Sequence, residues 1–278
     1  MNQNWQIYQN ALVWVAAPGS EPPSEAEARR ALREKGTMFV RWTSDFNCAS
    51  PTEWWYCLCD HFTDIESLKR KQRYRIRRGL ANCNITRLEK GEIARYAEEV
   101  FDVADASFAD YPAKYRPTLD KTEFCRSLIT KDEEVEYWLC RGKQDDRLIG
   151  YGYCRRKDED VYLEQVKVPT AYLDTDVNAA LAYKITEYYL GERKVRYLID
   201  GERNIRHETN YQAFLVQFIG FRYAYCRLHV IYSPAMGIAV RLLYPFRKTI
   251  ERAGRYSSFL YNVFCTLKQE EIRRSMVV

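Results

Sequence analysis

The stretch that decides the fold is LIGYGYCRRKDEDVYLEQVKVPTAYLDTDVNAALAYK, residues 148–184. It predicts two strands, over 147–156 and 161–168, because both segments are rich in aromatic and β-branched residues. The polar turn between them is short enough for a hairpin. Pro169 ends the second strand, and we expect a helix over 176–190.

The junction between that second strand and its helix is unusual. A helix N-terminus that follows a strand can hold an anion, because its first amide groups are unpaired. Glycines usually let phosphate oxygens approach the backbone there, yet none lies between Gly152 and Gly191. Asp174 and Asp176 stand at the junction instead. We expect Asp176 to cap the helix, since a carboxylate there complements the helix dipole.

The segments around this stretch continue the pattern. From residue 83 onward we expect a strand, two helices, three antiparallel strands, a helix, a strand, a helix and a strand. The other members of this series are 83–88, 92–111, 121–130, 134–142, 195–200, 209–218 and 221–232. This order indicates the α+β class, a mixed α/β sandwich.

The chain divides into three parts at the level of sequence. A small N-terminal α/β unit is expected over 1–62, a main domain over 63–232 and a helical, basic tail over 233–278. In the first part, 24–36 predicts a helix that Ser24 caps and Gly36 ends. The tail predicts two helices that mix apolar and basic residues. They could lie on a membrane surface, but we expect them to pack on the body.

Composition limits the classes of protein. The chain has 278 residues, 46% of them hydrophobic, which is enough to bury a core. The net charge of +5 is mild for this length, and we do not expect a DNA-binding protein. No run approaches the ~20 apolar residues of a membrane-spanning helix, so no transmembrane segment is expected.

The cysteines indicate a reducing compartment. There are nine, an odd number, and most lie in apolar or strand-like contexts, which suits buried thiols in a cytoplasmic protein. Cys57, Cys59 and His61 would share one face of a strand and could be metal ligands. No CxxC pair completes a tetrahedral set, so no metal is expected.

A basic helix is expected over 63–80. Thr63 and Glu66 have capping-box spacing, and Gly79 is a candidate stop. Seven of the ten residues from 69 to 78 are Lys or Arg. A solvated helix face is one interpretation. The other is a binding site for a polyanion such as tRNA or an acidic membrane surface, formed by Lys69, Arg70, Arg73, Arg75, Arg77 and Arg78.

The order of elements resembles the Gcn5-related N-acetyltransferase (GNAT) fold. The segments that carry the resemblance are LIGYGYCRR, VYLEQVKVP with its helix, and NYQAFLVQFIGFRYAYC, where Gly-Phe opens the last strand. A narrower resemblance lies in SLKRKQRYRIRRGLANCNITRL, which is similar to the basic helix and strand that open a GNAT-like unit in the Fem group of peptidoglycan-bridge transferases. Fem-type proteins carry two such units, whereas here the first would be cut to about 60 residues.

The resemblance implies where a site would lie. In the GNAT fold the cleft opens where the fourth and fifth strands splay apart, which here are 161–168 and 195–200. Many GNAT enzymes place an acid on the first of these, so we expect Glu164 as general base, with Tyr162 on the same face as a substrate ligand. The other interpretation of Glu164 is an exposed side chain or an ion pair with Arg155 or Arg156.

The loop DGERNIRHETN, residues 200–210, follows the second of these strands and is dense in polar side chains. Loops at strand ends commonly carry sites. His207 can titrate near neutral pH and is a second catalytic candidate. Expected substrate-binding residues in this loop are Asp200, Arg203, Arg206 and Asn210.

The donor is left open. Acetyl-CoA enzymes of this fold commonly bind the pyrophosphate through a Gln/Arg-x-x-Gly-x-Gly/Ala loop, whose place is taken here by PTAYLDTDVNAA. Its carboxylates would repel a diphosphate. Fem-type proteins use aminoacyl-tRNA, so the donor is either acyl-CoA or aminoacyl-tRNA.

Three functions follow from these observations. The first is an N-acyltransferase with a donor that is not bound in the usual way and an amine acceptor, small or lipid-linked. The second is an ordinary acyl-CoA N-acyltransferase. The third is a catalytically silent GNAT-like domain that binds an anionic partner or surface. The expected location is cytoplasmic, with peripheral membrane contact as an option.

Overall fold

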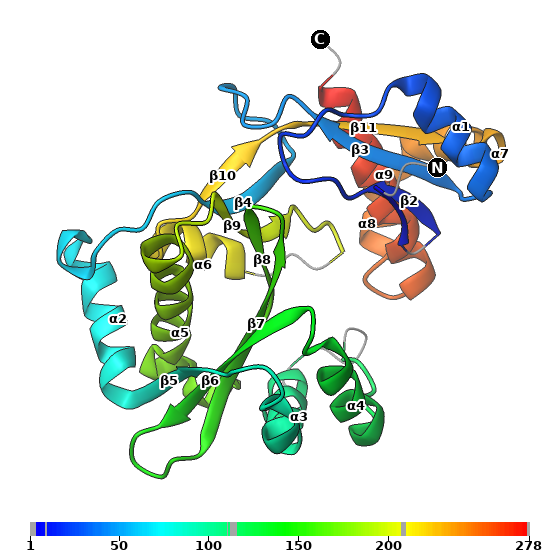
Figure 1. Cartoon of the computed structure of the whole chain (residues 1–278). Coiled ribbons are helices and arrows are strands. Elements are labelled where there is room, and N and C mark those ends of the chain that lie inside the picture. Colours follow the sequence, from blue (N-terminus) through cyan, green and yellow to red (C-terminus); the bar gives the residue numbers. More distant parts are fainter. Residues whose placement is uncertain (1–3, 9, 110, 112–115, 207–209, 277–278) are drawn as a thin grey trace. The chain divides into compact units, whose positions relative to one another are not determined.

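The computed structural model describes residues 4–8, 10–109, 111, 116–206 and 210–276 (Figure 1). The chain forms two compact units. Unit 1 comprises Met1–Tyr56, Glu202–Thr209 and Tyr223–Val278, and unit 2 comprises Cys57–Gly201 and Asn210–Arg222. The three-part division expected from the sequence stays a prediction. The two units are described separately below.

Unit 1 is built on a four-stranded sheet of order β1-β2-β3-β11. β1 and β2 form an antiparallel hairpin, β2 is parallel to β3, and β3 is antiparallel to β11. These strands are β1 (Trp5–Tyr8), β2 (Ala11–Trp14), β3 (Phe39–Ser44) and β11 (Arg227–Tyr232). Alternation along β3 sends Val40 and Trp42 into a core with Leu32.

One helix covers that face of the sheet. α1 (Glu25–Lys35) has the expected capping box between Ser24 and Glu27, and Gly36 ends it in the left-handed conformation. On the opposite face, Arg41 of β3 donates to Gln269 Oε1 at 3.4 Å, which places α9 (Ser258–Ser275) there. The unit is therefore a sheet between helices, so both faces of β3 are covered.

The C-terminal helices of unit 1 differ in burial. α9 buries Leu267 and Ile272 and contacts β11, as the expectation of a packed tail requires. The segment before it consists of α7 (Pro234–Leu243), the 3₁₀ turn η5 (Tyr244–Phe246) and α8 (Arg247–Ala253). α7 buries only Val240, and α8 buries none of its residues.

The second sheet has seven strands in the order β10-β4-β9-β8-β7-β6-β5. Neighbours from β5 to β8 are antiparallel, and β8 is parallel to β9. The chain crosses between the units along β4, β9 and β10. The bounds are β4 (Trp55–Cys59), β5 (Cys83–Arg87), β6 (Val135–Gly142), β7 (Leu148–Lys157), β8 (Asp160–Lys167), β9 (Tyr197–Glu202) and β10 (Arg222–Tyr225).

Helices cover both faces of this sheet within unit 2. α3 (Ile93–Ala109) and α4 (Lys121–Lys131) pack on one face around Val100, Leu128 and Tyr137. The other face carries a helix that continues as a π-helix, with a basic helix packed outside it (Figure 1). These are α5 (Val177–Thr186), η4 (Glu187–Glu192) and α2 (Arg70–Asn82). Because α5 lies between the sheet and α2, eight of its ten residues are buried.

The basic helix is shorter at its start than the sequence predicts. Asp64 caps a separate 3₁₀ turn, η1 (Ile65–Ser67), by accepting a hydrogen bond from the Glu66 amide at 2.9 Å. Leu68 is extended, and α2 begins at Arg70. Gly79 does not stop the helix: it is a buried interior residue, and α2 runs on to Asn82.

The last predicted strand, 221–232, is two strands. β10 and β11 belong to different sheets, and the chain changes sheets at Cys226. The Cys226 amide bonds to the Trp54 carbonyl at 3.0 Å, and Thr52 Oγ1 donates to the Cys226 carbonyl at 2.8 Å. These bonds satisfy the backbone where the ladder is interrupted.

Candidate functional site

β8 and β9 separate partway along their length. Their register covers Asp160–Tyr197, Val161–Leu198 and Tyr162–Ile199, but β8 continues to Lys167 and β9 to Glu202. A bulge lies just beyond the last pair: Leu163 faces Cys154 and Gln165 faces Tyr153, so Glu164 is the extra residue. Bulges bend the strand that carries them, and this one bends β8 where it leaves β9.

Glu164 has a cationic partner. Its Oε1 lies 2.5 Å from Arg155 Nε, and Arg155 also bonds to the Glu134 carboxylate. Tyr162 is half-buried and lies opposite Arg155 in the β7–β8 ladder. The ion pair with Arg155, one of the two alternatives for Glu164, is therefore present. The carboxylate is tied to a guanidinium, although it stands beside the point where the strands separate.

Asp200 is the first β9 residue beyond the last pair with β8. Burial raises the pKa of its carboxyl to about 6, and a hydrogen bond from Gln212 opposes that rise. Gln212 Nε2 donates to Asp200 Oδ2 at 3.1 Å. A carboxylate with this pKa is ionised at neutral pH and can still accept a proton, which suits a general base.

Tyr211 lies beside Asp200 at the first position of α6 (Tyr211–Phe218). Burial, and then the negative charge of Asp200, raise the pKa of its phenol. Among the residues that the structure describes, its buried hydroxyl has no hydrogen-bond partner. Buried hydroxyls are normally paired, so this one is a candidate donor to a substrate. Tyr211 and Gln212 were missed at the level of sequence, because only the fold buries them against Asp200.

The junction before α5 is built around Asp176. The residues before it form the 3₁₀ turn η3 (Thr170–Thr175), and Asp176 itself is left-handed, with φ 59°. Its carboxylate is 1% exposed and lies 2.5 Å from Arg75 Nε and 2.7 Å from Arg78 Nε. Asp176 is the N-cap residue of α5, as expected, but its side chain makes no capping hydrogen bond and pairs with two arginines of α2 instead.

The basic helix is partly neutralised by such pairs. Arg75 and Arg78 meet Asp176, and Arg73 and Arg77 meet Glu66. Arg75 also lies over the Phe218 ring at 4.4 Å. The exposed cations at the start of the helix are Lys69, Arg70 and Lys71. Four of the six residues expected to bind a polyanion therefore already form ion pairs within the protein.

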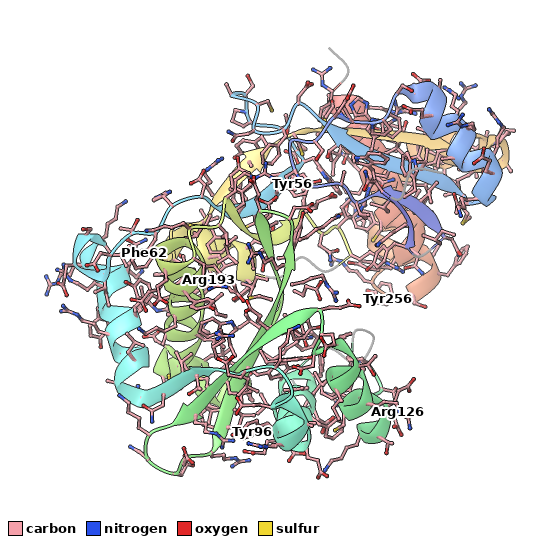
Figure 2. The ribbon with its side chains drawn as sticks, in the orientation of Figure 1. Tyr56, Phe62, Tyr96, Arg126, Arg193 and Tyr256 are labelled. Atoms are coloured by element: carbon pink, nitrogen blue, oxygen red, sulfur yellow. The ribbon has the colours of Figure 1, made fainter. Side chains whose placement is uncertain are left out.

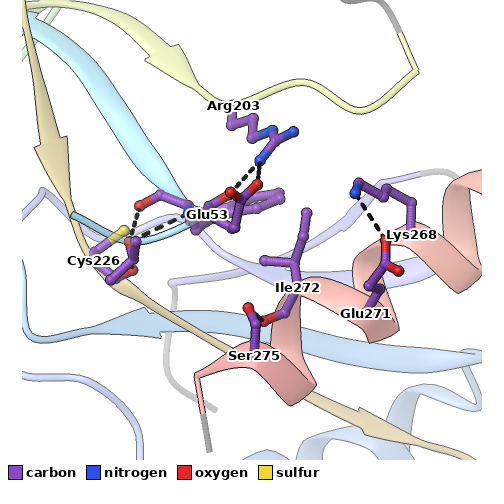
Figure 3. Close-up of polar contacts among 9 residues, drawn as sticks. Glu53, Arg203, Cys226, Lys268, Glu271, Ile272 and Ser275 are labelled. Carbon is purple, nitrogen blue, oxygen red and sulfur yellow. Dashed lines mark hydrogen bonds and ion pairs between the residues drawn. The ribbon is translucent and has the colours of Figure 1, made fainter.

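The loop after β9 contributes to both units. Arg203 belongs to unit 1, where it bonds to the Glu53 carboxylate at 2.6 Å (Figure 3). Its guanidinium also lies over the Trp55 ring at 4.7 Å. Arg206, also in unit 1, bonds to Asn262. Asn210 belongs to unit 2, is exposed and precedes α6, where its carbonyl accepts from the Phe214 amide at 2.9 Å. His207 lies outside the described residues.

The cysteine and histidine candidates for a metal have other contacts. Cys59 Sγ donates to the carbonyls of Gly220 and His61, and the His61 ring bonds to Asp60. Burial raises the pKa of Cys59 to about 11, and that of the buried Cys57 thiol also rises. All nine cysteines are free. Among the described residues, no three His, Cys, Asp or Glu side chains group as metal ligands.

The described chain has no helix long and apolar enough to cross a bilayer. No family model and no curated protein matches the sequence. Solved structures do match it.

One match is the C-terminal domain (DUF2156) of a putative lysylphosphatidylglycerol synthetase from Agrobacterium fabrum: TM-score 0.55, 11% identity, 85% of this chain and 83% of that one. Another is L-PGS from Bacillus licheniformis: TM-score 0.52, 8% identity, 86% of this chain and 83% of that one. FemX matches with TM-score 0.48 and 10% identity over 77% of this chain and 78% of its own. At these identities the likeness concerns the fold alone. The expected mixed α/β fold is confirmed by the first two of these structures.

Proposed function

We propose that this chain is a GNAT-like N-acyltransferase that moves an acyl or aminoacyl group from an activated ester or thioester to an amine. The observation that carries the proposal is the separation of β8 from β9 beyond Tyr162 and Ile199, with the half-buried Asp200 at that point. A donor carbonyl and an incoming amine must be held side by side. Two strand edges that are no longer paired with each other offer backbone groups to such a donor.

The chemistry makes three demands that this region can meet. The amine nitrogen attacks the carbonyl carbon, a C–N bond forms, and the C–O or C–S bond to the carrier breaks. Backbone N–H groups of β8 beyond Tyr162 would stabilise the oxygen as it gains charge. An alkylammonium has a pKa of about 10.4 and must lose a proton before it attacks.

We propose that the Asp200 carboxylate accepts this first proton from the ammonium group. After the attack the Tyr211 hydroxyl gives its proton to the departing oxygen or sulfur and takes up the second proton of the nitrogen, so the phenol is restored and the amide is left neutral. Glu164 remains the alternative base, held in its ion pair with Arg155. Tyr162, Arg203, Arg206, His207 and Asn210 remain proposed substrate or catalytic residues.

The Asp176 junction bears on the donor. Its carboxylate already pairs with Arg75 and Arg78 at the N-terminus of α5, the place where acetyl-CoA enzymes of this fold bind pyrophosphate. A diphosphate there would have to compete with this carboxylate for both guanidinium groups, which are already paired. This favours a donor that is held in another way, and aminoacyl-tRNA is the first candidate. One structural neighbour is named for an aminoacylated phospholipid, lysylphosphatidylglycerol, which makes a lipid-linked acceptor reasonable.

The test measures donor use directly. Wild-type protein is incubated with labelled aminoacyl-tRNA or with acetyl-CoA, each with a panel of soluble and lipid-linked amines, and labelled amide is counted. We expect amide from aminoacyl-tRNA and neither product nor thermal stabilisation with acetyl-CoA. Asp200→Asn should lower the rate about 100-fold, and Glu164→Gln less than tenfold.

Asp158→Asn is the matched control, because Asp158 is exposed in the β7–β8 turn and already left-handed, a conformation that Asn tolerates. Full turnover in Asp200→Asn would remove Asp200 as the base, and a large loss in Glu164→Gln alone would assign that role to Glu164. Stabilisation and turnover with acetyl-CoA would make the protein an ordinary acyl-CoA enzyme. Absence of amide with every donor would overturn the enzymatic proposal.

A further inference from the structure

A cluster of apolar side chains is exposed on the C-terminal helices of unit 1. Ile238, Leu242 and Phe246 are each more than 60% exposed, and their spacing of four residues puts them on one stripe of α7 and η5. Leu243, Tyr256 and Phe259 are also exposed. Figure 2 shows Tyr256, which is 92% exposed, extending from the ribbon between α8 and α9. These six residues are called the C-terminal apolar surface below.

This concentration is unusual within the described chain. Twelve large hydrophobic side chains are exposed, and half of them lie between residues 238 and 259. Single exposed hydrophobic residues need no explanation, but a contiguous group indicates an interaction site. The core does not need these side chains either, since α9 and Val240 already make the contacts with the sheet.

The same segment is strongly basic. Residues 234–258 contain five Lys or Arg and one acidic residue, Glu251. Arg247 pairs with Glu271 at 2.9 Å. The other four cations are exposed and interleave with the apolar residues; they are Arg241, Lys248, Arg252 and Arg255.

The combination of apolar and cationic side chains favours one kind of binding partner over the others. A second copy of this chain would place like charges against each other in a symmetric interface. A nucleic acid would use the cations, but Ile238, Leu242 and Leu243 cannot stack on bases as aromatic rings do. The surface of a bilayer with anionic lipids uses both: aliphatic and aromatic side chains enter the acyl boundary while Lys and Arg meet the headgroups.

We infer that α7, η5, α8 and the start of α9 form a docking surface for a bilayer that contains anionic lipids. The surface lies in unit 1, and the inference uses no residue of the proposed acyl-transfer site, so either proposal can fail alone. Docking by these helices needs no helix that spans the membrane, because the apolar side chains enter only the interface.

The experiment is vesicle sedimentation with the full chain. Wild-type protein should bind vesicles of phosphatidylcholine mixed with phosphatidylglycerol at least tenfold more tightly than vesicles of phosphatidylcholine alone, and added salt should weaken the binding. The double variant Leu242→Ser, Phe246→Ser should lose at least tenfold in affinity, and so should Lys248→Glu, Arg252→Glu. Ile129→Ser is the matched control, because Ile129 is an exposed aliphatic residue on α4 of unit 2.

All substituted side chains are exposed, so the variants should keep the wild-type circular dichroism spectrum. Unchanged vesicle binding by Leu242→Ser, Phe246→Ser would overturn the inference, as would absence of binding by the wild type. Loss of vesicle binding in Lys69→Glu, Arg70→Glu, Lys71→Glu alone would assign the membrane contact to α2 instead. The Leu242→Ser, Phe246→Ser variant could instead keep vesicle binding and lose a concentration-dependent dimer or tRNA binding that the wild type shows. That result would assign the surface to the second copy or to tRNA.

Discussion

Gly79 of α2 lies directly against the backbone carbonyl of Asp176. A Cβ at position 79 would overlap the Asp176 oxygen and lie 2.8 Å from the Ala180 Cβ. Glycine therefore lets α2 approach the start of α5 closely enough for Arg75 and Arg78 to reach the Asp176 carboxylate. The contact fixes the junction after β8, which is the segment that sets the donor side of the proposed site.

Gly79→Ala tests this contact. The added methyl group meets backbone, which cannot rotate away, so we expect a loss of at least about 2 kcal/mol in the free energy of unfolding. The measurement is the denaturant midpoint. Gly237→Ala is the control: Gly237 is also inside a helix, α7, but its Cβ would meet only the Tyr232 Cβ at 3.7 Å. Alanine there should be neutral or stabilise by about 0.5–1 kcal/mol. Equal midpoints for the two variants would contradict the close packing.

Asp176→Ala tests the role of the buried carboxylate. Its removal leaves Arg75 and Arg78 beside the N-terminus of α5 without their partner, and we expect a loss of about 2 kcal/mol, less than for a fully buried pair because both arginines reach solvent. The uncovered cations should then bind inorganic phosphate, which should raise the melting temperature of this variant and not of the wild type.

Asp174→Ala is the control for that measurement. The Asp174 side chain is exposed, and Arg78 bonds to its backbone carbonyl, which the substitution keeps. Phosphate should leave the melting temperature of this variant unchanged. If phosphate stabilises the wild type as much as Asp176→Ala, then the carboxylate does not exclude anions, and the argument against a diphosphate at this junction loses its support.

The central strands and their helices could be predicted from sequence because their signals are local. The aromatic and β-branched runs of β6, β7 and β8 and the turns between them lie within a few residues of each other, and so do Ser24, Glu27 and Gly36 of α1. Gly79 shows the limit of this reasoning. A glycine that ends a helix and a glycine that admits a neighbouring backbone have the same local sequence, and only the position of α5 distinguishes them.

The candidate site was harder to predict from the sequence, because its contacts join residues that are far apart in the chain. Arg75 and Asp176 are 101 residues apart, so the sequence could not replace the expected cap with an ion pair. The change of sheet at Cys226 could not be predicted from the sequence. The residues of 221–232 before and after Cys226 are both typical of strands, so the segment reads as one strand. Glu164 was proposed through the GNAT resemblance, and Asp200 because loops at strand ends commonly carry sites. The burial that distinguishes them, and that involves Tyr211 and Gln212, comes from tertiary packing.

The pKa of Asp200 predicts how stability depends on pH. The pKa of this carboxyl in the folded protein, about 6, lies above its ordinary value of 3.8. Folding therefore favours the protonated form of Asp200. Its contribution to the free energy of unfolding is fully present below pH 3.8 and is lost as the pH rises to about 6. Each tenfold change in proton affinity corresponds to about 1.4 kcal/mol.

Asp200→Asn removes this titration. Its free energy of unfolding should exceed that of the wild type by up to about 3 kcal/mol above pH 6, and the difference should disappear towards pH 4. Denaturant titrations at several pH values measure it. An Asp200→Asn difference that stays constant with pH would show that the carboxyl group keeps an ordinary pKa and would weaken its assignment as the base.

The exposed start of α2 predicts the response of tRNA binding to salt. Lys69, Arg70 and Lys71 are exposed, whereas the arginines from 73 onward have carboxylate partners. Replacing all three with Glu should lower tRNA affinity at least tenfold, and the slope of log affinity against log salt should become shallower by about 2–3, since each lost phosphate contact accounts for about 0.7–0.9. Filter binding at several salt concentrations provides both quantities.

The control for this variant removes three cations elsewhere: Arg33→Glu on α1, Arg126→Glu on α4 and Arg156→Glu on β7, all exposed. It makes the same change in net charge, so it isolates the contribution of α2 from the general attraction between a basic protein and RNA. If both triple variants lose affinity and slope equally, the binding is non-specific and α2 is no tRNA site. If only the α2 variant loses affinity and slope, α2 is a surface that can hold tRNA while β8 and β9 hold its acyl group. That result would support aminoacyl-tRNA as the donor.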